Sequence, residues 1–123
     1  MVEIYRTDQQ VLNTLTDIQD GCWINMVDPT SKELEQIAER FEIEPEDISS
    51  ALDEEESSRI SLEDGYTVIL VDIPTPEVRH EKKMYTTIPL GIILKSEAII
   101  TVCKVVGRFL GWYYGKNHEN GKA

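Results

Sequence analysis

Hydrophobic and polar residues alternate at the start of the chain, and this pattern predicts β-structure there. Val2 and Ile4 alternate with polar neighbours in a first short strand that has one solvated face. The segment 22–27 (CWINMV) is rich in residues that favour strands and is predicted as another. The intervening segment 11–18 (VLNTLTDI) fits either an edge strand or a helical turn.

The spacing changes to a helical one in the segment 28–41 (DPTSKELEQIAERF). Thr30 is placed to accept a hydrogen bond from the amide of Glu33, whose side chain reaches back to Thr30, which is the capping-box arrangement. One apolar stripe then follows at helical spacing: Leu34, Ile37, Ala38 and Phe41. A second, shorter helix is predicted to begin near Pro45, with Ile48, Ala51 and Leu52 on its buried face.

Strand-like segments return in the second half of the chain. They are 59–62, 66–73, 85–94 and 98–103, with turns at 63–65 and 95–97. The apolar run 68–71 indicates a central strand that is covered on both faces. We expect Pro74 and Pro76 to end that strand and the charged segment 77–83 (EVRHEKK) to form an exposed loop. Pro89 and Gly91 predict a bulge or kink in the next strand.

This order of elements predicts an α+β fold with a mixed, mainly antiparallel sheet. The two helices come from the N-terminal half of the chain and are expected on one face of the sheet. A chain of 123 residues fits one domain with a core of its own. If both faces of the 68–71 strand need cover, the second layer is missing from this chain.

The composition is acidic, with 12 Lys and Arg against 23 Asp and Glu and a formal charge of −11. This charge argues against nucleic acid as a partner, because phosphate neutralisation needs a basic surface. It permits cation binding, although a solvated acidic surface is the commoner explanation. Cys22 and Cys103 lie in apolar runs and are predicted to be buried free thiols. Without a signal peptide or long apolar segment, the chain is expected to be soluble and cytoplasmic.

The usual signatures of catalysis are absent from the sequence. It contains no phosphate-binding glycine loop, no dinucleotide fingerprint, no nucleophile elbow and no zinc-protease motif. The two histidines, His80 and His118, lie in polar segments without a packed partner. Asp72 is the one acid inside an apolar strand, where an edge position or a backbone partner explains it. We therefore expect no enzyme and no catalytic residue.

The acidic run Asp53–Glu56 is the remaining chemical feature. It follows the second helix, where the helix dipole is negative and acidic groups are unfavourable. Mg²⁺ prefers oxygen ligands and keeps several waters, so it binds through one or two carboxylates. The run fits either shared coordination of Mg²⁺ with a second subunit or a solvated acidic loop.

An ordered series of segments resembles the N-terminal cytoplasmic domain of the CorA-type magnesium transporter family. The series comprises CWINMVDPTSKELEQIAERFEI, EPEDISSALDEEESSRI, YTVILVDIP and YTTIPLGIILKSEAIITVC. The similarity covers residues 1–103, which we take as the domain. The segment 104–123 differs from the family and forms an atypical tail.

The resemblance implies an α/β/α sandwich, left incomplete here, because later helices complete it in full-length relatives. It implies a regulatory domain of a pentameric Mg²⁺ and Co²⁺ channel, in which divalent ions between subunits keep the channel closed. It further implies weakly bound Mg²⁺, a position on the cytoplasmic side of the membrane, and partners in other copies and in the remaining helical and transmembrane segments. The candidate metal ligands are Asp47, Asp53 and Glu54, because Ser50 occupies the position of the family's regulatory aspartate.

Two departures from the family leave a rival open. The chain lacks the Gly-Met-Asn signature of the pore mouth and the membrane helix before it. Its tail is basic, with Lys104, Arg108, Lys116 and Lys122 against Glu119, and contains Trp112, Tyr113 and Tyr114. The alternative is a free-standing cytoplasmic interaction domain without transport activity. The chain alone is expected to be a monomer or a non-native dimer.

Overall fold

The structure, a computed structural model, describes residues 1–79 and 81–104. Its elements are β1 (Val2–Asp8), β2 (Val11–Leu15), β3 (Cys22–Val27), α1 (Ser31–Phe41), α2 (Pro45–Ser49), the 3-10 helix η1 (Ser50–Leu52), β4 (Arg59–Glu63), β5 (Tyr66–Arg79), β6 (Lys82–Leu94) and β7 (Ala98–Cys103). The predictions for His80, His118 and the tail beyond Lys104 lie outside the described residues.

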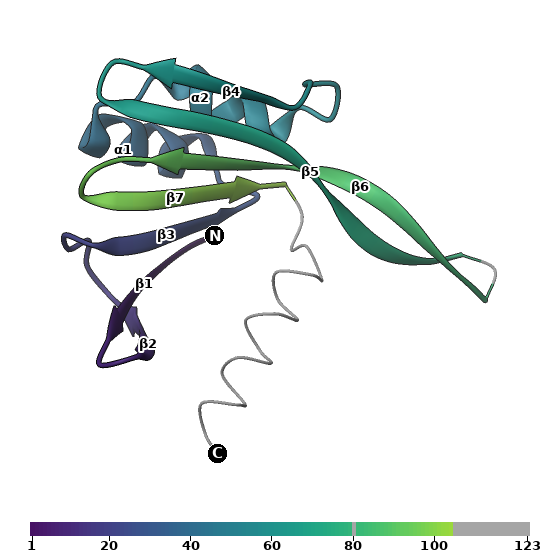
Figure 1. Ribbon diagram of the computed structural model, residues 1–123, viewed down its shortest axis with the longest axis horizontal. Coiled ribbons are helices and arrows are strands. Elements are labelled where there is room, and N and C mark those ends of the chain that lie inside the picture. Colours follow the sequence, from purple (N-terminus) through teal and green to yellow (C-terminus); the bar gives the residue numbers. More distant parts are fainter. Residues whose placement is uncertain (80, 105–123) are drawn as a thin grey trace.

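The described strands form one seven-stranded sheet in the order β2-β1-β3-β7-β6-β5-β4. β3 and β7 are parallel, and the other described neighbours are antiparallel. The helices lie together on one face of the sheet (Figure 1). The predicted α+β fold with a mixed, mainly antiparallel sheet is confirmed, and the ambiguous segment after β1 is an edge strand.

The capping box at the start of α1 is present as predicted. The Glu33 amide donates to Thr30 Oγ1 at 3.1 Å, and the Thr30 amide donates to Glu33 Oε1 at 2.9 Å. Hydrogen bonds to the carboxylate, first from the Thr30 backbone, lower the pKa of Glu33. Ile37, Ala38 and Phe41 of the apolar stripe are buried against the sheet, so local sequence and core packing agree along this helix.

The core lies between the helices and one face of the sheet. Alternate residues of the strands β3, β7, β6 and β5 point into it, among them Ile24, Ile100, Ile93 and Val68. The pairing of β5 with β6 continues through Pro89 and Gly91 without an inserted residue, so of the predicted bulge or kink the bulge is wrong. Gly91 instead allows close packing, because an added Cβ there would lie 2.6 Å from Ala51 Cβ of η1.

No described helix lies on the other face of the sheet, where Val27, Leu90 and Cys103 form a small buried cluster and other apolar side chains are exposed. We call it the open face; its apolar side chains include Ile60, Leu62, Leu94 and Ile99, which are exposed. β5 is an interior strand between β6 and β4, and on this second face its Val71 and Ile73 pack against the buried cluster. The prediction of a central strand covered on both faces therefore holds at this end of β5, whereas Leu62 and Leu94 at the other end of the face are exposed.

The chain does not leave the sheet at Pro74. β5 continues to Arg79 and β6 begins at Lys82, so the expected charged loop forms the end of a long hairpin. This hairpin extends beyond the other strands (Figure 1). The predictions that the strand ends at the prolines and that an exposed loop follows are both wrong.

The direction of the backbone groups explains why these prolines are tolerated. Lys95 and Ala98 exchange two backbone hydrogen bonds, of 3.0 and 3.3 Å. From this pair onward, alternate residues of each strand direct their N–H and C=O groups to one neighbouring strand or to the other. Odd-numbered β6 residues direct their N–H and C=O groups toward β7, and even-numbered β5 residues direct theirs toward β4. β4 and β7 both end before they reach the three prolines of the hairpin. The nitrogen atoms of Pro74, Pro76 and Pro89 therefore face open edges, where a missing N–H leaves the β5–β6 ladder intact.

Candidate metal-binding site

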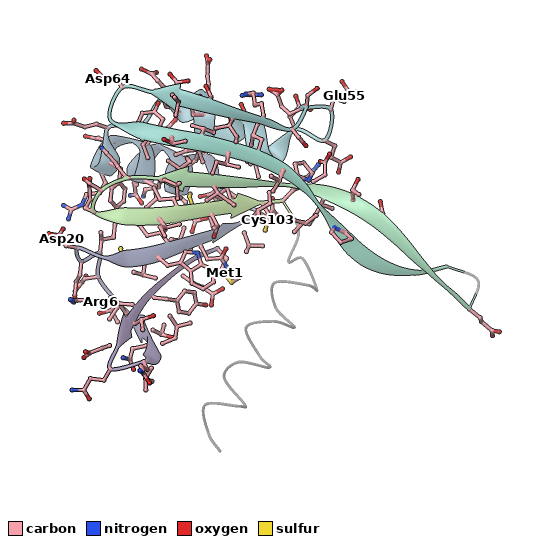
Figure 2. The ribbon with its side chains drawn as sticks, in the orientation of Figure 1. Met1, Arg6, Asp20, Glu55, Asp64 and Cys103 are labelled. Atoms are coloured by element: carbon pink, nitrogen blue, oxygen red, sulfur yellow. The ribbon has the colours of Figure 1, made fainter. Side chains whose placement is uncertain are left out.

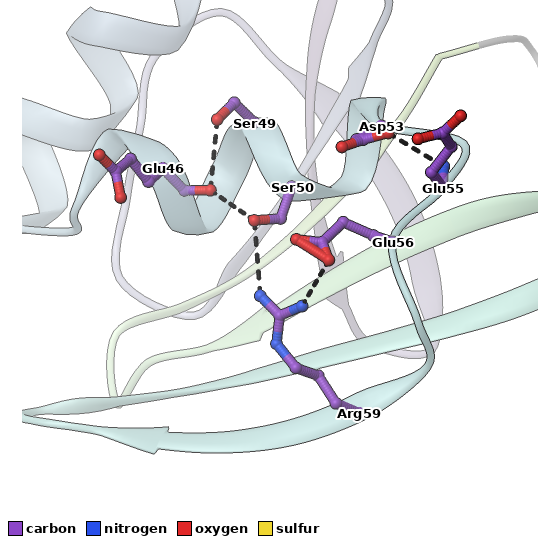
Figure 3. Close-up of polar contacts among 7 residues, drawn as sticks. All are labelled: Glu46, Ser49, Ser50, Asp53, Glu55, Glu56 and Arg59. Carbon is purple, nitrogen blue, oxygen red and sulfur yellow. Dashed lines mark hydrogen bonds and ion pairs between the residues drawn. The ribbon is translucent and has the colours of Figure 1, made fainter.

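The short helix α2, its continuation η1 and the loop to β4 carry the predicted metal ligands. Pro45 occupies the first turn of α2, and the chain turns into η1 at Ser50. Ile48 and Ala51 are fully buried and fix these two turns on the sheet. The polar side chains on the outer side are thereby held at the end of the sheet near the base of the long hairpin (Figures 1 and 3).

Asp47 is turned toward the sheet. The Tyr66 hydroxyl donates to Asp47 Oδ2 at 2.5 Å and accepts a hydrogen bond from the Glu44 amide at 3.2 Å. Burial, and then the hydrogen bond to Asp47, raise the pKa of Tyr66 to about 12. One carboxylate oxygen of Asp47 is thus already bonded within the chain, and no local sequence pattern indicates this partner.

Ser50, at the position of the family's aspartate, is bonded within its own helix. Its Oγ donates to the carbonyl oxygen of Glu46 at 2.7 Å. The guanidinium of Arg59 lies beside it, with Nη2 3.5 Å from Ser50 Oγ and Nη1 3.1 Å from Glu56 Oε2 (Figure 3). A cation of the chain itself therefore already lies next to Ser50 and Glu56.

Asp53 and Glu54 point into solvent after η1. Asp53 Oδ1 accepts a hydrogen bond from the Glu55 amide at 2.9 Å, which orders the turn (Figure 3). Glu54 Oε1 lies 3.9 Å from Lys104 Nζ, and both side chains are mostly exposed, so this ion pair is weak. Each of these two carboxylates keeps oxygen atoms accessible to a hydrated ion.

The three predicted ligands do not converge within one chain. Among the described residues, no group of three or more His, Cys, Asp or Glu side chains is arranged to hold a metal ion. Asp47 faces Tyr66, whereas Asp53 and Glu54 face solvent. Of the three predicted ligands, a single copy therefore offers two exposed carboxylates, a donor set that fits a largely hydrated Mg²⁺ rather than a protein cage.

The remaining candidate features lie elsewhere. A hollow of about 430 Å³ is lined in part by Tyr5, Arg6, Trp23 and Ile99. Arg6 and Glu55 lie toward opposite edges of the sheet (Figure 2). Asp72 is exposed and accepts a hydrogen bond from Ser58 at 3.4 Å, so it does not have the burial that a general acid or base requires.

A family model matches most of this chain. Residues 19–104 match the model described as CorA-like Mg2+ transporter protein, which is more than half of the chain. The chain therefore belongs to the family of CorA-like Mg²⁺ transporter proteins. Among the described residues, no helix is long and apolar enough to cross a membrane.

Individual relatives from Methanocaldococcus jannaschii are similar to this chain. Its cobalt/magnesium transport protein CorA is 29% identical over 90 residues, which are 70% of this chain and 27% of that protein. The complete structure of its CorA magnesium transporter matches with a TM-score of 0.74 at 18% identity, over 99% of this chain and 38% of that chain. The structure of the soluble domain of that CorA matches with a TM-score of 0.73 at 21% identity, over 94% and 45%. These structures show the shared fold, and the chain spans about a quarter of the length of the curated CorA relative.

A further match concerns a short segment only. Phosphoglucosamine mutase from Lachnospira eligens is 94% identical over 18 residues, which are 15% of this chain and 4% of that enzyme. A segment of this length does not form a domain of its own, so the match carries neither a fold nor an activity to this chain.

Proposed function

We propose that this chain is a regulatory domain of a CorA-like transporter for Mg²⁺ and Co²⁺, on the cytoplasmic side of the membrane. Family membership and the match to a CorA soluble domain support the transporter context. The observation that carries the regulatory role is the pair of solvent-facing carboxylates, Asp53 and Glu54, at the end of a short helix that is rigidly packed on the sheet.

The ion would be shared between copies. Asp53 and Glu54 hold a hydrated Mg²⁺ together with carboxylates of a neighbouring subunit, in a homopentamer of the kind that the resemblance implies. Asp47 joins them only if it leaves Tyr66, while Glu55 and Glu56 raise the local negative potential. The ion favours the assembly state in which the two carboxylate groups are close, so its loss shifts the equilibrium between the closed and open arrangements.

Binding is expected to be weak. Arg59 and Lys104 partly neutralise the same loop through Glu56 and Glu54. Mg²⁺ also gives up its bound waters reluctantly, so exposed carboxylates bind it mainly through those waters. A regulatory site that senses intracellular Mg²⁺ needs such a weak, reversible interaction.

The open face belongs to the same proposal. The open face exposes Ile60, Leu62, Leu94 and Ile99, and an apolar surface of this kind marks an interaction site. In the longer protein, the following helical segments cover this face and connect the domain to the transmembrane segments. A free-standing interaction domain is the second candidate, because the same open face would serve a separate partner. The downstream reading frame distinguishes the two: apolar segments with Gly-Met-Asn after the first support the transporter.

Calorimetric titration tests the metal site. We expect Mg²⁺ to bind the wild type with a Kd of roughly 1 mM and to lose this binding in Asp53→Ala/Glu54→Ala. The matched control is Glu35→Ala/Glu39→Ala, which removes two exposed acids of α1 and should leave binding unchanged. Equal binding by all three proteins would assign the affinity to net charge and remove the site.

A further inference from the structure

β4 is an edge strand with unusually little protection. It ends the sheet order, and its side chains Ile60 and Leu62 are 72% and 81% exposed, the highest values among the large apolar residues described. Its sequence, RISLE, contains no proline or lysine, and its pairing with β5 contains no bulge. Natural proteins use such features to prevent strands from adding to an open edge.

The backbone groups of β4 that do not bond to β5 belong to Ile60 and Leu62. The hydrogen bonds between Lys95 and Ala98, followed through the registers of β6 and β5, show which β4 residues direct their backbone groups toward β5. Odd-numbered β4 residues direct their N–H and C=O groups to β5, and Ile60 and Leu62 direct theirs outward. The edge therefore offers two donors and two acceptors to another strand.

The sequence of this strand is complementary to itself. We propose that β4 pairs with β4 of a second copy, antiparallel about a two-fold axis at Ser61. In this register Arg59 lies opposite Glu63 of the partner subunit, and Ile60 lies opposite the partner's Leu62. Two Arg–Glu pairs and four backbone hydrogen bonds form per dimer, and the apolar open face becomes continuous across both copies.

The charged residues are available for this contact. Arg59 forms an ion pair with Glu56 of its own chain at 3.1 Å, but its guanidinium has five N–H donors and can bond a second carboxylate. Glu63 is exposed, and its Oε1 accepts a hydrogen bond from Ser61 at 2.7 Å. Both side chains lie on the same face of β4 because the two positions differ by an even number.

The strand at the other edge of the sheet, β2, lacks the charge complementarity of β4. β2 has the sequence VLNTL, and antiparallel pairing about Asn13 would place no opposite charges across the axis. Charge complementarity thus singles out β4. The two-fold contact closes on itself and differs from the contact of a cyclic ring, so this proposal is independent of the proposed regulatory function.

Charge reversal tests the register. In EDTA, sedimentation equilibrium should show a concentration-dependent monomer–dimer equilibrium for the wild type. Arg59→Glu and Glu63→Arg should each weaken it about tenfold or more, because both pairs become repulsive. An equimolar mixture of the two variants should dimerise again, since a strand with two glutamates then pairs with a strand with two arginines. Lys32→Glu, a reversal on the exposed surface of α1, is the matched control and should dimerise like the wild type.

A cysteine at the axis gives a second measurement. Ser61→Cys places two thiols opposite each other within the Cα separation that a disulfide needs, so a mild oxidant should cross-link this variant. Ser49→Cys, on exposed α2, should not cross-link, and the native Cys22 and Cys103 are buried. A wild type that stays monomeric, or a mixture of charge variants that fails to recover the dimer although each is folded by circular dichroism, would overturn the proposal.

Discussion

At the scale of single residues, Tyr66 links the sheet to the short helix. Its hydroxyl donates to Asp47 at 2.5 Å and accepts from the Glu44 amide at 3.2 Å. The pKa of Tyr66 rises from 10.0 to about 12 in the folded protein. A raised folded-state pKa means that the stabilisation is complete below about pH 10 and is lost as the pH rises through about 12.

Tyr66→Phe should lower the free energy of unfolding by about 2 kcal/mol at pH 7, because it removes a hydrogen bond to a charged group. The difference from wild type should shrink between pH 10 and 11, because Tyr66 of the unfolded chain ionises there while the folded chain resists ionisation beside Asp47. Urea denaturation at pH 7, 9, 10 and 11 measures both effects. Glu46→Gln, which removes a neighbouring acid but leaves the Tyr66–Asp47 pair, is the control. A difference that stays constant with pH would contradict this role of the hydroxyl.

Whether a contact between two residues can be predicted depends on how far apart they lie in the sequence. Thr30 and Glu33 are three positions apart, and their reciprocal bonds follow from local helix geometry. The sequence presents Asp47 as a metal candidate in the first turn of a helix, but its partner Tyr66 is 19 positions away. Only the fold brings them together, so no local pattern predicts this pair.

At the scale of elements, Gly91 sets the distance between β6 and η1. The backbone of Gly91 allows Ala51 to approach so closely that a Cβ would lie 2.6 Å away. The sequence pattern predicts a bulge or kink at this glycine because it does not reveal the partner element. The register of β6 continues through the glycine, and its lack of a side chain serves the packing of the short helix.

Gly91→Ala should lower the free energy of unfolding by about 1–3 kcal/mol, because the added methyl group overpacks the contact. Ala51→Gly alone should also destabilise, since it removes a buried methyl group and loosens η1. The double variant should be more stable than the sum of the two losses predicts, because the new methyl group fills the vacated space. Thermal unfolding of the four proteins measures this coupling, and strictly additive losses would show that the two positions are not in contact.

The prolines of the hairpin show why element boundaries are harder to predict than element types. Pro74 and Pro76 are strand breakers only where a neighbouring strand needs their N–H. β4 ends opposite Leu70, so that need is absent. Sequence alone does not report where a neighbouring strand ends, because strand order is a property of the whole sheet.

At the scale of the whole molecule, the two faces of the sheet differ in character. Ile93 and Ile100 are almost fully buried under the helices, whereas Leu94 and Ile99, one position away in each strand, are 40% and 46% exposed. The sequence predicts the helical layer on one face of the sheet. It does not predict that β3 and β7 are parallel neighbours, because their pairing joins two segments far apart in the domain.

The open face leads to a paired prediction. Ile99→Thr should change the free energy of unfolding by no more than about 0.5 kcal/mol, because this side chain is already partly in solvent. Ile93→Thr, the same substitution on the helical face, should cost about 2–4 kcal/mol, because it leaves a cavity and buries a hydroxyl group. Denaturant unfolding gives both values, and the Ile99 variant should also bind less of an apolar fluorescent dye. Equal losses at the two positions would mean that the open face is covered in solution. In a longer protein with the proposed helical layer on this face, the cost at Ile99 should approach that at Ile93.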